Sequence, residues 1–198
     1  MKLYMLNSSH PQTHAQLLAP TKTWTNVHEC PECRRNTSKL LPPLELVWEV
    51  GIDVIGDFSW WGYLFVVTPL MVDIFKSLEV DLQYYPTHIA EAPRKKGARR
   101  RPYAGPPLTW VVPNRRIPFE EDSTGLHMSD QCHTCGHRNY KFRRNGLIFS
   151  KNDLHGTQMF KVDQFERANA VLVTRDFANL LRDISPTNVE FWEAGESV

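Results

Sequence analysis

The only cysteines of this 198-residue chain form two Cys-x-x-Cys pairs, Cys30 with Cys33 and Cys132 with Cys135. A tight turn between cysteines at this spacing aims both sulfurs at one point, so two pairs supply the four thiolates of a tetrahedral zinc site. A closed set of four sulfurs leaves no coordination position for a catalytic water. The sequence therefore predicts a structural Zn²⁺ site made of all four cysteines.

Two other interpretations of the cysteines stay open, namely two separate redox or disulfide pairs and four reduced cysteines that only pack. A redox pair opens a helix that follows a strand, whereas the residues after the two pairs, 34–38 and 136–140, have the composition of turns. Histidines near the pairs are expected on the surface, and each is an alternative ligand in place of a sulfur: His28, His127, His133 and His137.

The separation of the two pairs adds a mechanical prediction. Residues 34–131 lie between them, whereas a free-standing zinc finger has a short intervening loop. Closing so long a loop costs an unfolded chain entropy, so a metal that closes it contributes to folding. We expect the site to clip the first part of the chain onto its last third.

The composition indicates a soluble globular protein. With 41% hydrophobic residues and a formal net charge of +1, the chain can bury a core and has no general attraction for nucleic acid or membranes. The apolar stretch within residues 1–10 is too short for a signal peptide. The most apolar stretch of the chain, residues 60–72, is too short to span a bilayer. These features predict a cytoplasmic protein without a membrane partner; they do not indicate an oligomeric state.

The order of apolar patterns and breakers predicts an α+β fold with a mixed or mainly antiparallel sheet and two helices. Thr68 followed by Pro69 marks the start of a helix that ends near Glu79, and Thr174 caps a second helix over residues 175–184. The expected apolar faces of the helices are Leu70, Ile74, Phe75 and Leu78 in the first and Phe177, Leu180, Leu181 and Ile184 in the second. The expected strands are residues 2–6, 44–50, 63–67, 80–85, 108–112, 147–149, 158–162, 170–173 and 188–192.

The two parts of the chain follow a similar plan. A cysteine pair, strands, a capped helix and a further strand occur in both, at nearly the same spacing. We treat residues 1–198 as a single domain and as a hypothesis divide it into related halves, 1–92 and 119–198. A loop rich in proline and arginine, residues 93–118, joins them.

Three groups of residues are candidates for binding a partner. Of the adjacent Trp60 and Trp61, one must leave the core side of a strand, and an exposed tryptophan is a good interface anchor. The other tryptophans in predicted strands, Trp48, Trp110 and Trp192, are interpreted as sheet packing. The remaining candidates are charged: a basic run, Arg94, Lys95, Lys96, Arg99, Arg100 and Arg101, and an acidic triplet, Glu120, Glu121 and Asp122. A solvated loop is the alternative interpretation of both runs.

Catalytic motifs are lacking in the sequence. It contains no glycine-rich phosphate loop, no Gly-x-Ser-x-Gly elbow and no His-Glu-x-x-His helix. Asp53 and Asp57 could form a carboxylate pair, but nothing nearby supplies a positioned second group. We therefore do not expect an enzyme.

The chain resembles the bacterial double-CXXCG motif family in its cysteine pairs, its opening residues 1–4, the segment 22–24 and the stretch 160–192. Members of that family are classed as immunity proteins, so the resemblance implies a cognate toxin protein as partner, neutralised by occlusion. The second pair is followed by Gly136, as in the family pattern, but the first is followed by Arg34. Glycine in that place takes a positive φ at little cost.

A second functional hypothesis is a zinc-stabilised nucleic-acid-binding or regulatory protein that acts through the basic loop, residues 94–101. Only Tyr103 lies close to this run, whereas proteins that bind single strands use several aromatic platforms. Nucleic acid is therefore the less favoured partner.

Overall fold

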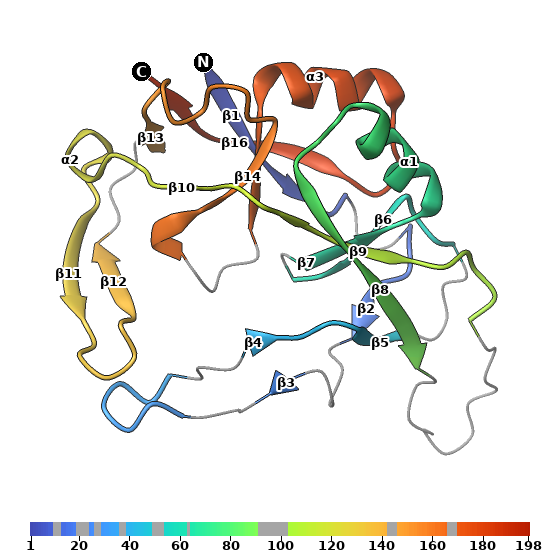
Figure 1. The fold of residues 1–198 in the computed structure, drawn as a ribbon, viewed down its shortest axis with the longest axis horizontal. Helices are drawn as coiled ribbons and strands as arrows, with labels where there is room; N and C mark the ends of the chain where they lie inside the picture. Colours follow the sequence, from blue (N-terminus) through green and yellow to red (C-terminus); the bar gives the residue numbers. More distant parts are fainter. Residues whose placement is uncertain are drawn as a thin grey trace.

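The computed structural model describes residues 1–9, 13–18, 24–25, 29–35, 39–48, 54–62, 64–90, 103–141, 146–165 and 170–198. This part of the chain forms two six-stranded sheets, two short hairpins and three α-helices (Figure 1). The predicted α+β class with mixed, mainly antiparallel sheets is confirmed. One helix more than the two predicted is present.

The first sheet is made chiefly by the N-terminal part of the chain. Its strands lie in the order β2 (Leu17–Leu18), β5 (Leu44–Trp48), β8 (Leu82–Ala90), β9 (Thr109–Pro113), β7 (Leu64–Val67) and β6 (Phe58–Trp61). All neighbours are antiparallel except β5 and β8, which are parallel.

The second sheet joins the two ends of the chain. Its order is β10 (Arg116–Ile117), β14 (Met159–Val162), β15 (Val171–Thr174), β1 (Lys2–Asn7), β16 (Glu190–Ser197) and β13 (Leu147–Phe149). The pairs β10–β14 and β13–β16 are parallel and the others antiparallel. The N-terminal amino group donates a hydrogen bond to the carbonyl oxygen of Ser197 at 2.9 Å, which holds both chain ends at this sheet.

Two hairpins carry the cysteine turns. One pairs β3 (Trp24–Thr25) with β4 (Lys39–Leu40), and the other pairs β11 (His127–Gln131) with β12 (Arg138–Lys141). Figure 1 shows both hairpins on the side of the molecule away from α1 and α3, with their turns facing each other. All five residues of β11 are exposed, so this hairpin projects from the body.

Two helices follow buried strands without an intervening loop. Helix α1 (Pro69–Ser77) comes directly after Thr68, and α3 (Arg175–Ile184) comes directly after Thr174; both threonines have the extended backbone of an N-cap. The third helix, α2 (Glu121–Thr124), is a single turn that the sequence did not predict, and a 3₁₀ turn occupies Asp163–Phe165.

The predicted apolar face of α1 is confirmed at Phe75, and at Ile74 and Leu78, which pack against the core, but it is wrong at Leu70 and misses Met71. The residues of α1 that are buried are Met71 and Phe75, whereas Leu70 is 60% exposed. The turn at Thr68 sets the rotation of the helix, so the positions three and seven residues beyond it face the sheets. In α3, Phe177 and Leu181 are buried as predicted, while Leu180 and Ile184 lie at its margin.

Three hydrophobic clusters stabilise the body. The central core contains both helices and both sheets, with Phe58, Phe75 and Phe177 among its members. A second cluster, around Phe149 and Phe160, belongs to the sheet that contains β1. A third, with Leu44, Leu46, Leu64, Leu108 and Trp110, belongs to the sheet that contains β9.

Two segments are more regular than predicted. Strand β8 runs through Pro86, where the sequence places its end, because Pro86 lies where pairing with β9 stops and pairing with β5 begins at Thr87. A proline that donates no hydrogen bond is tolerated at such a position. The predicted loop 93–118 contains β10 in addition to the expected strand, which is β9.

Lys161 is a buried lysine in the second sheet, on the strand next to the edge strand β10. It lies in β14, is 7% exposed and pairs in register with Arg116. Burial, with a contribution from the charge of Arg116, lowers the pKa of Lys161 from 10.5 to about 8. The folded state therefore holds the charged form at a penalty.

We predict that Lys161→Met stabilises the protein at pH 7 by up to about 3 kcal/mol. The folded pKa of Lys161 is depressed, so the penalty is fully present below pH 8 and fades as the pH rises to 10.5. The difference in free energy of unfolding between variant and wild type, measured with urea at several pH values, should shrink over that range. The exposed Lys151 provides the control Lys151→Met; a gain from both variants alike would contradict the explanation.

Candidate metal centre

The four cysteine sulfurs converge at the tips of the two hairpins. They lie within 4.8 Å of one another, and all four cysteines are free of disulfides. The sulfur of Cys30 is 3.6 Å from that of Cys132, and the sulfur of Cys33 is 3.5 Å from that of Cys135. Four sulfurs at about 2.3 Å from one ion in a tetrahedron are about 3.8 Å apart, so the set fits a tetrahedral metal. The predicted group of metal ligands is therefore brought together.

The backbones of the two cysteine turns are equivalent. In the first, the N–H of Arg34 donates to the carbonyl of Cys30 at 2.8 Å, and that of Cys30 donates to Arg35 at 2.9 Å. In the second, Gly136 and Cys132 donate in the same way to Cys132 and His137, at 2.8 and 2.9 Å. Each turn thus holds its two sulfurs on one side.

Arg34 takes the backbone conformation that the family pattern assigns to glycine. Its φ is +56°, close to the +69° of Gly136. The first turn therefore has the same shape without glycine, at the cost that a Cβ brings in the left-handed region.

A carboxylate joins one turn to the other. Glu32 accepts hydrogen bonds from the Thr134 hydroxyl at 2.8 Å and from the Thr134 backbone N–H at 3.1 Å. These hydrogen bonds, the one from the hydroxyl first, lower the pKa of Glu32, so the carboxylate is charged at neutral pH. Arg35 also reaches across, and donates to the side-chain oxygen of Asn139 at 3.0 Å.

The thiols differ in acidity. Backbone N–H groups, that of Cys33 first, are directed at Cys30 and lower its pKa to about 7. The pKa of Cys132 is raised to about 12: a hydrogen bond from the backbone of Cys135 lowers it, but burial and the adjacent thiols oppose ionisation more strongly. A cation among the sulfurs favours the thiolates, since a coordinating thiol is deprotonated.

No histidine joins this ligand group in the described part of the chain. His127 and His133 are exposed, and His137 is half-buried. His28 lies outside the described residues. Four sulfurs close the coordination shell, so the arrangement can hold an ion but offers no position for a substrate.

The predicted partner-binding residues lie in different environments. Trp60 is 3% exposed, and its indole N–H donates to the carbonyl of Asn188, so it belongs to the core. Trp61 is half-buried and is the member of the pair that reaches the surface. The basic run, Arg94, Lys95, Lys96, Arg99, Arg100 and Arg101, lies outside the described residues.

The acidic triplet has a structural component. Glu120 precedes α2 and is exposed, as is Asp122. Glu121 is half-buried and accepts a hydrogen bond from the Tyr140 hydroxyl at 3.2 Å. Tyr140 also packs against Phe119 and Phe165, so this contact anchors the second hairpin to the body. At Glu121 the alternative interpretation of a solvated loop therefore does not hold.

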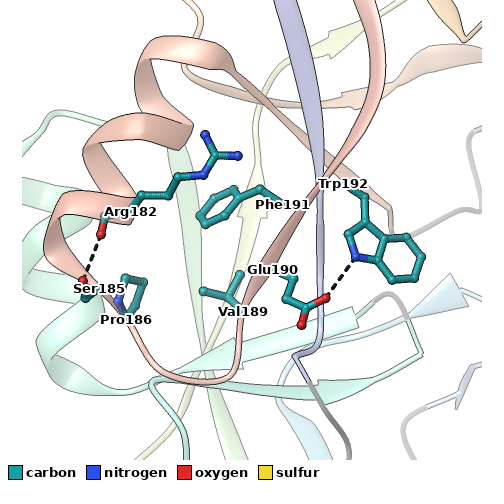
Figure 2. Close-up of a pocket in the computed structure, with 7 residues that line it drawn as sticks. All are labelled: Arg182, Ser185, Pro186, Val189, Glu190, Phe191 and Trp192. Carbon is teal, nitrogen blue, oxygen red and sulfur yellow. Dashed lines mark hydrogen bonds between the residues drawn. The ribbon is translucent and has the colours of Figure 1, made fainter.

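A surface feature that the sequence did not predict lies between α3 and β16. Trp192, assigned from the sequence to sheet packing, is 51% exposed, and it borders a groove of about 420 Å³ that Arg182, Pro186, Val189 and Glu190 also line (Figure 2). Its indole N–H donates to Glu190 at 3.1 Å. The sequence pattern of the strand predicted that Trp192 packs against the sheet. Its exposure follows only from the register of β16 in the sheet, which the sequence does not give.

Arg182, which also lines this groove, is fixed in place. Its guanidinium lies 4.7 Å from the ring centre of Tyr4 and 4.8 Å from that of Phe191, and it donates to Asn179 at 2.8 Å. Among the described residues, no acidic side chain forms an ion pair with it. The residues that line the groove thus include an ordered cation and an exposed indole; Figure 2 shows Phe191 directed toward Arg182 and Trp192 directed away from it.

No family model matches the chain, and no curated protein matches it either. The resemblance to the double-CXXCG family therefore stays a prediction. In the described part of the chain, no helix is long and apolar enough to cross a membrane.

We predict that Arg34→Gly stabilises the metal-loaded protein by about 1 kcal/mol, because glycine relieves the cost of a positive φ. Gly136→Ala should destabilise it by a similar amount; a Cβ there meets no atom within 4 Å, so strain alone acts. Denaturant unfolding measures both changes. Arg34→Ala is the control, since it removes the side chain but keeps the Cβ; a gain as large as that of Arg34→Gly would refute the strain argument.

Proposed function

We propose that this protein is a bacterial immunity protein that binds a cognate toxin in the cytoplasm and neutralises it by occlusion, with a structural Zn²⁺ held by the four cysteines. It binds stoichiometrically and catalyses no reaction. The family resemblance of the sequence motivates the proposal. The observation that carries it is the exposed Trp192, which lines a groove together with Arg182 and so offers a surface suited to holding another protein.

Zinc is the metal we assign because a closed set of four thiolates at this spacing is typical of structural zinc. Cys30, Cys33, Cys132 and Cys135 would hold the ion, which supplies a cross-link and leaves no reactive position. The ion's part in the function is to fix the two hairpins, and with them the surface that they present.

Trp192 and Arg182 are the residues we assign to the toxin interface. Tryptophan and arginine dominate the hot spots of protein interfaces, because each contributes a large contact area and directional polar groups. The guanidinium is already held between Tyr4 and Phe191, so little side-chain entropy is lost when a partner binds. An acidic group of the toxin would complement Arg182, and Trp61 and the charged runs remain further candidates.

The metal part of this proposal predicts one Zn²⁺ per chain. Chelation should lower the melting temperature by roughly 10 °C or more, because the ion closes a long loop. Cys33→Ser and Cys135→Ser should each abolish stoichiometric zinc, measured by elemental analysis. His133→Ala, the matched control, should retain it. Full zinc content in either cysteine variant, or unchanged melting after verified removal, would exclude the structural site.

The partner part predicts that the tagged protein, isolated from its host at moderate salt, retains one stoichiometric protein. That protein should be toxic when expressed alone and harmless when co-expressed. Recovery of nucleic acid in its place, with binding that weakens steeply with salt, would overturn the proposal in favour of the nucleic-acid alternative.

With that partner in hand, Trp192→Ala should raise the Kd by roughly 30-fold, equivalent to about 2 kcal/mol, as is usual for a hot spot. Isothermal titration calorimetry measures the change. Leu70→Ala removes a similarly exposed apolar side chain on α1 and should leave the Kd within about twofold. Equal effects of the two substitutions would exclude the groove from the interface.

A further inference from the structure

The two six-stranded sheets share one pattern of five strands. In the first sheet the order is β5, β8, β9, β7, β6, and in the second it is β13, β16, β1, β15, β14. The first two strands are parallel in each sheet, and the remaining neighbours are antiparallel. The helices α1 and α3 follow β7 and β15, which hold the same place in the pattern.

The central strand of each sheet comes from the other part of the chain. Strand β1 is flanked by β15 and β16, although the remaining strands of the pattern span residues 147–197. Strand β9 is flanked by β7 and β8, although its companions span residues 44–90. In Figure 1 the blue β1 accordingly lies beside the red β16, and the yellow-green β9 lies beside β8.

The register of these two strands is the same. Tyr4 lies opposite Val173 on one side and Glu193 on the other. Thr109 lies opposite Val67 and Pro86. Val67 and Val173 each immediately precede the threonine that caps a helix, so Tyr4 and Thr109 occupy equivalent positions. The following residues of β1 and β9 correspond in the same way, so Leu6 is equivalent to Val111.

Burial follows this equivalence. Leu3 and Leu108, one residue before these positions, are buried in the outer clusters of their respective sheets. Leu6 and Val111, two residues beyond them, are buried in the central core that the sheets share. Each central strand thus fills the same two places in the packing.

An aromatic contact repeats as well. Arg182, eight residues after Thr174, lies over the ring of Phe191. Lys76, eight residues after Thr68, lies over the ring of Tyr84 at 5.3 Å. Phe191 lies opposite Leu6 and Tyr84 opposite Val111, so the two rings occupy equivalent positions too.

The strands that follow β1 and β9 lie at the edges of the sheets. After β1, which lies in the second sheet, the chain enters the first sheet as β2, which pairs with β5. After β9, which lies in the first sheet, the chain enters the second sheet as β10, which pairs with β14. The two edge strands occupy opposite edges of the pattern, so they are the part that differs between the sheets.

We propose that the chain is a fused, strand-exchanged dimer: two copies of one folding unit, each of which gives its first strand to a slot in the sheet of the other. The N-terminal unit comprises β1 and the elements up to β8, and the C-terminal unit begins at β9. The slot between β15 and β16 and the slot between β7 and β8 are equivalent binding sites for a first strand. The cysteine turns, one from each unit, meet between the two.

Interchanging the two central strands in the full-length chain tests this proposal. The interchange variant carries Leu-Thr-Trp-Val-Val at residues 3–7 and Leu-Tyr-Met-Leu-Asn at residues 108–112. Its substitutions are Tyr4→Thr, Met5→Trp, Leu6→Val, Asn7→Val, Thr109→Tyr, Trp110→Met, Val111→Leu and Val112→Asn. The control variant carries the two interchanged sets in reverse order, Val-Val-Trp-Thr-Leu at residues 3–7 and Asn-Leu-Met-Tyr-Leu at residues 108–112, which puts a threonine at the buried position 6 and an asparagine at the buried position 108.

Thermal unfolding followed by circular dichroism is the measurement. We expect the interchange variant to unfold in one cooperative transition within about 10 °C of the parent, and the reversed control to lack that transition. Two further variants replace the central strand of one sheet only. With them, a destabilising contact in one slot does not obscure whether the other slot tolerates the foreign strand. Failure of both single-slot variants to exceed their reversed controls would overturn the equivalence of the slots.

Discussion

The pairing of β1 between β15 and β16 is the constraint on which the rest of the structure depends. It places the first residues of the chain in the middle of a sheet that residues 147–197 otherwise provide. The opposite relation holds for β9, so neither sheet has its central strand until both parts of the chain are present. Contacts between such distant residues cost loop entropy before any packing rewards them. Both sheets and the central core therefore form together, and the body of the protein behaves as one cooperative unit.

The cysteine turns stand outside that unit. The hairpin that carries Cys132 and Cys135 has an entirely exposed β11 and touches the body mainly through Tyr140, so burial contributes little to its position. A metal bound at the tips replaces the missing core, because coordination fixes ligands that apolar contacts do not. The hydrogen bonds from Thr134 to Glu32 also orient one turn on the other. Apolar packing thus holds the body, whereas coordination would hold the turns, and a bound ion would stabilise the whole chain by linking its two parts.

The sequence predicted what local pattern determines. Strands such as β7 and β15, the helices that directly follow Thr68 and Thr174, and the meeting of four cysteines all follow from spacing and residue type. The order of strands did not, since β1 and β9 have the same apolar pattern whichever sheet receives them. Leu70 was placed on the buried face of α1 in error, and Met71 was missed, because a strand-to-helix turn, and not the helix itself, sets the rotation of the helix. Arg34 was unexpected because a ligand turn imposes a backbone conformation that residue type alone would avoid.

A comparison of the equivalent positions Trp192 and Tyr85 bears on the function. Tyr85 lies opposite Trp110, and the two rings pack at 5.2 Å. Trp192 lies opposite Met5, and 51% of its surface remains exposed. The position of Tyr85 in the first sheet, which is equivalent to that of Trp192 in the second, therefore holds an aromatic side chain that packs against another ring. The fold does not require the indole of Trp192 to be exposed. An exposed tryptophan that stability does not explain, in a groove that an ordered arginine also lines, supports the proposal that this surface binds another protein.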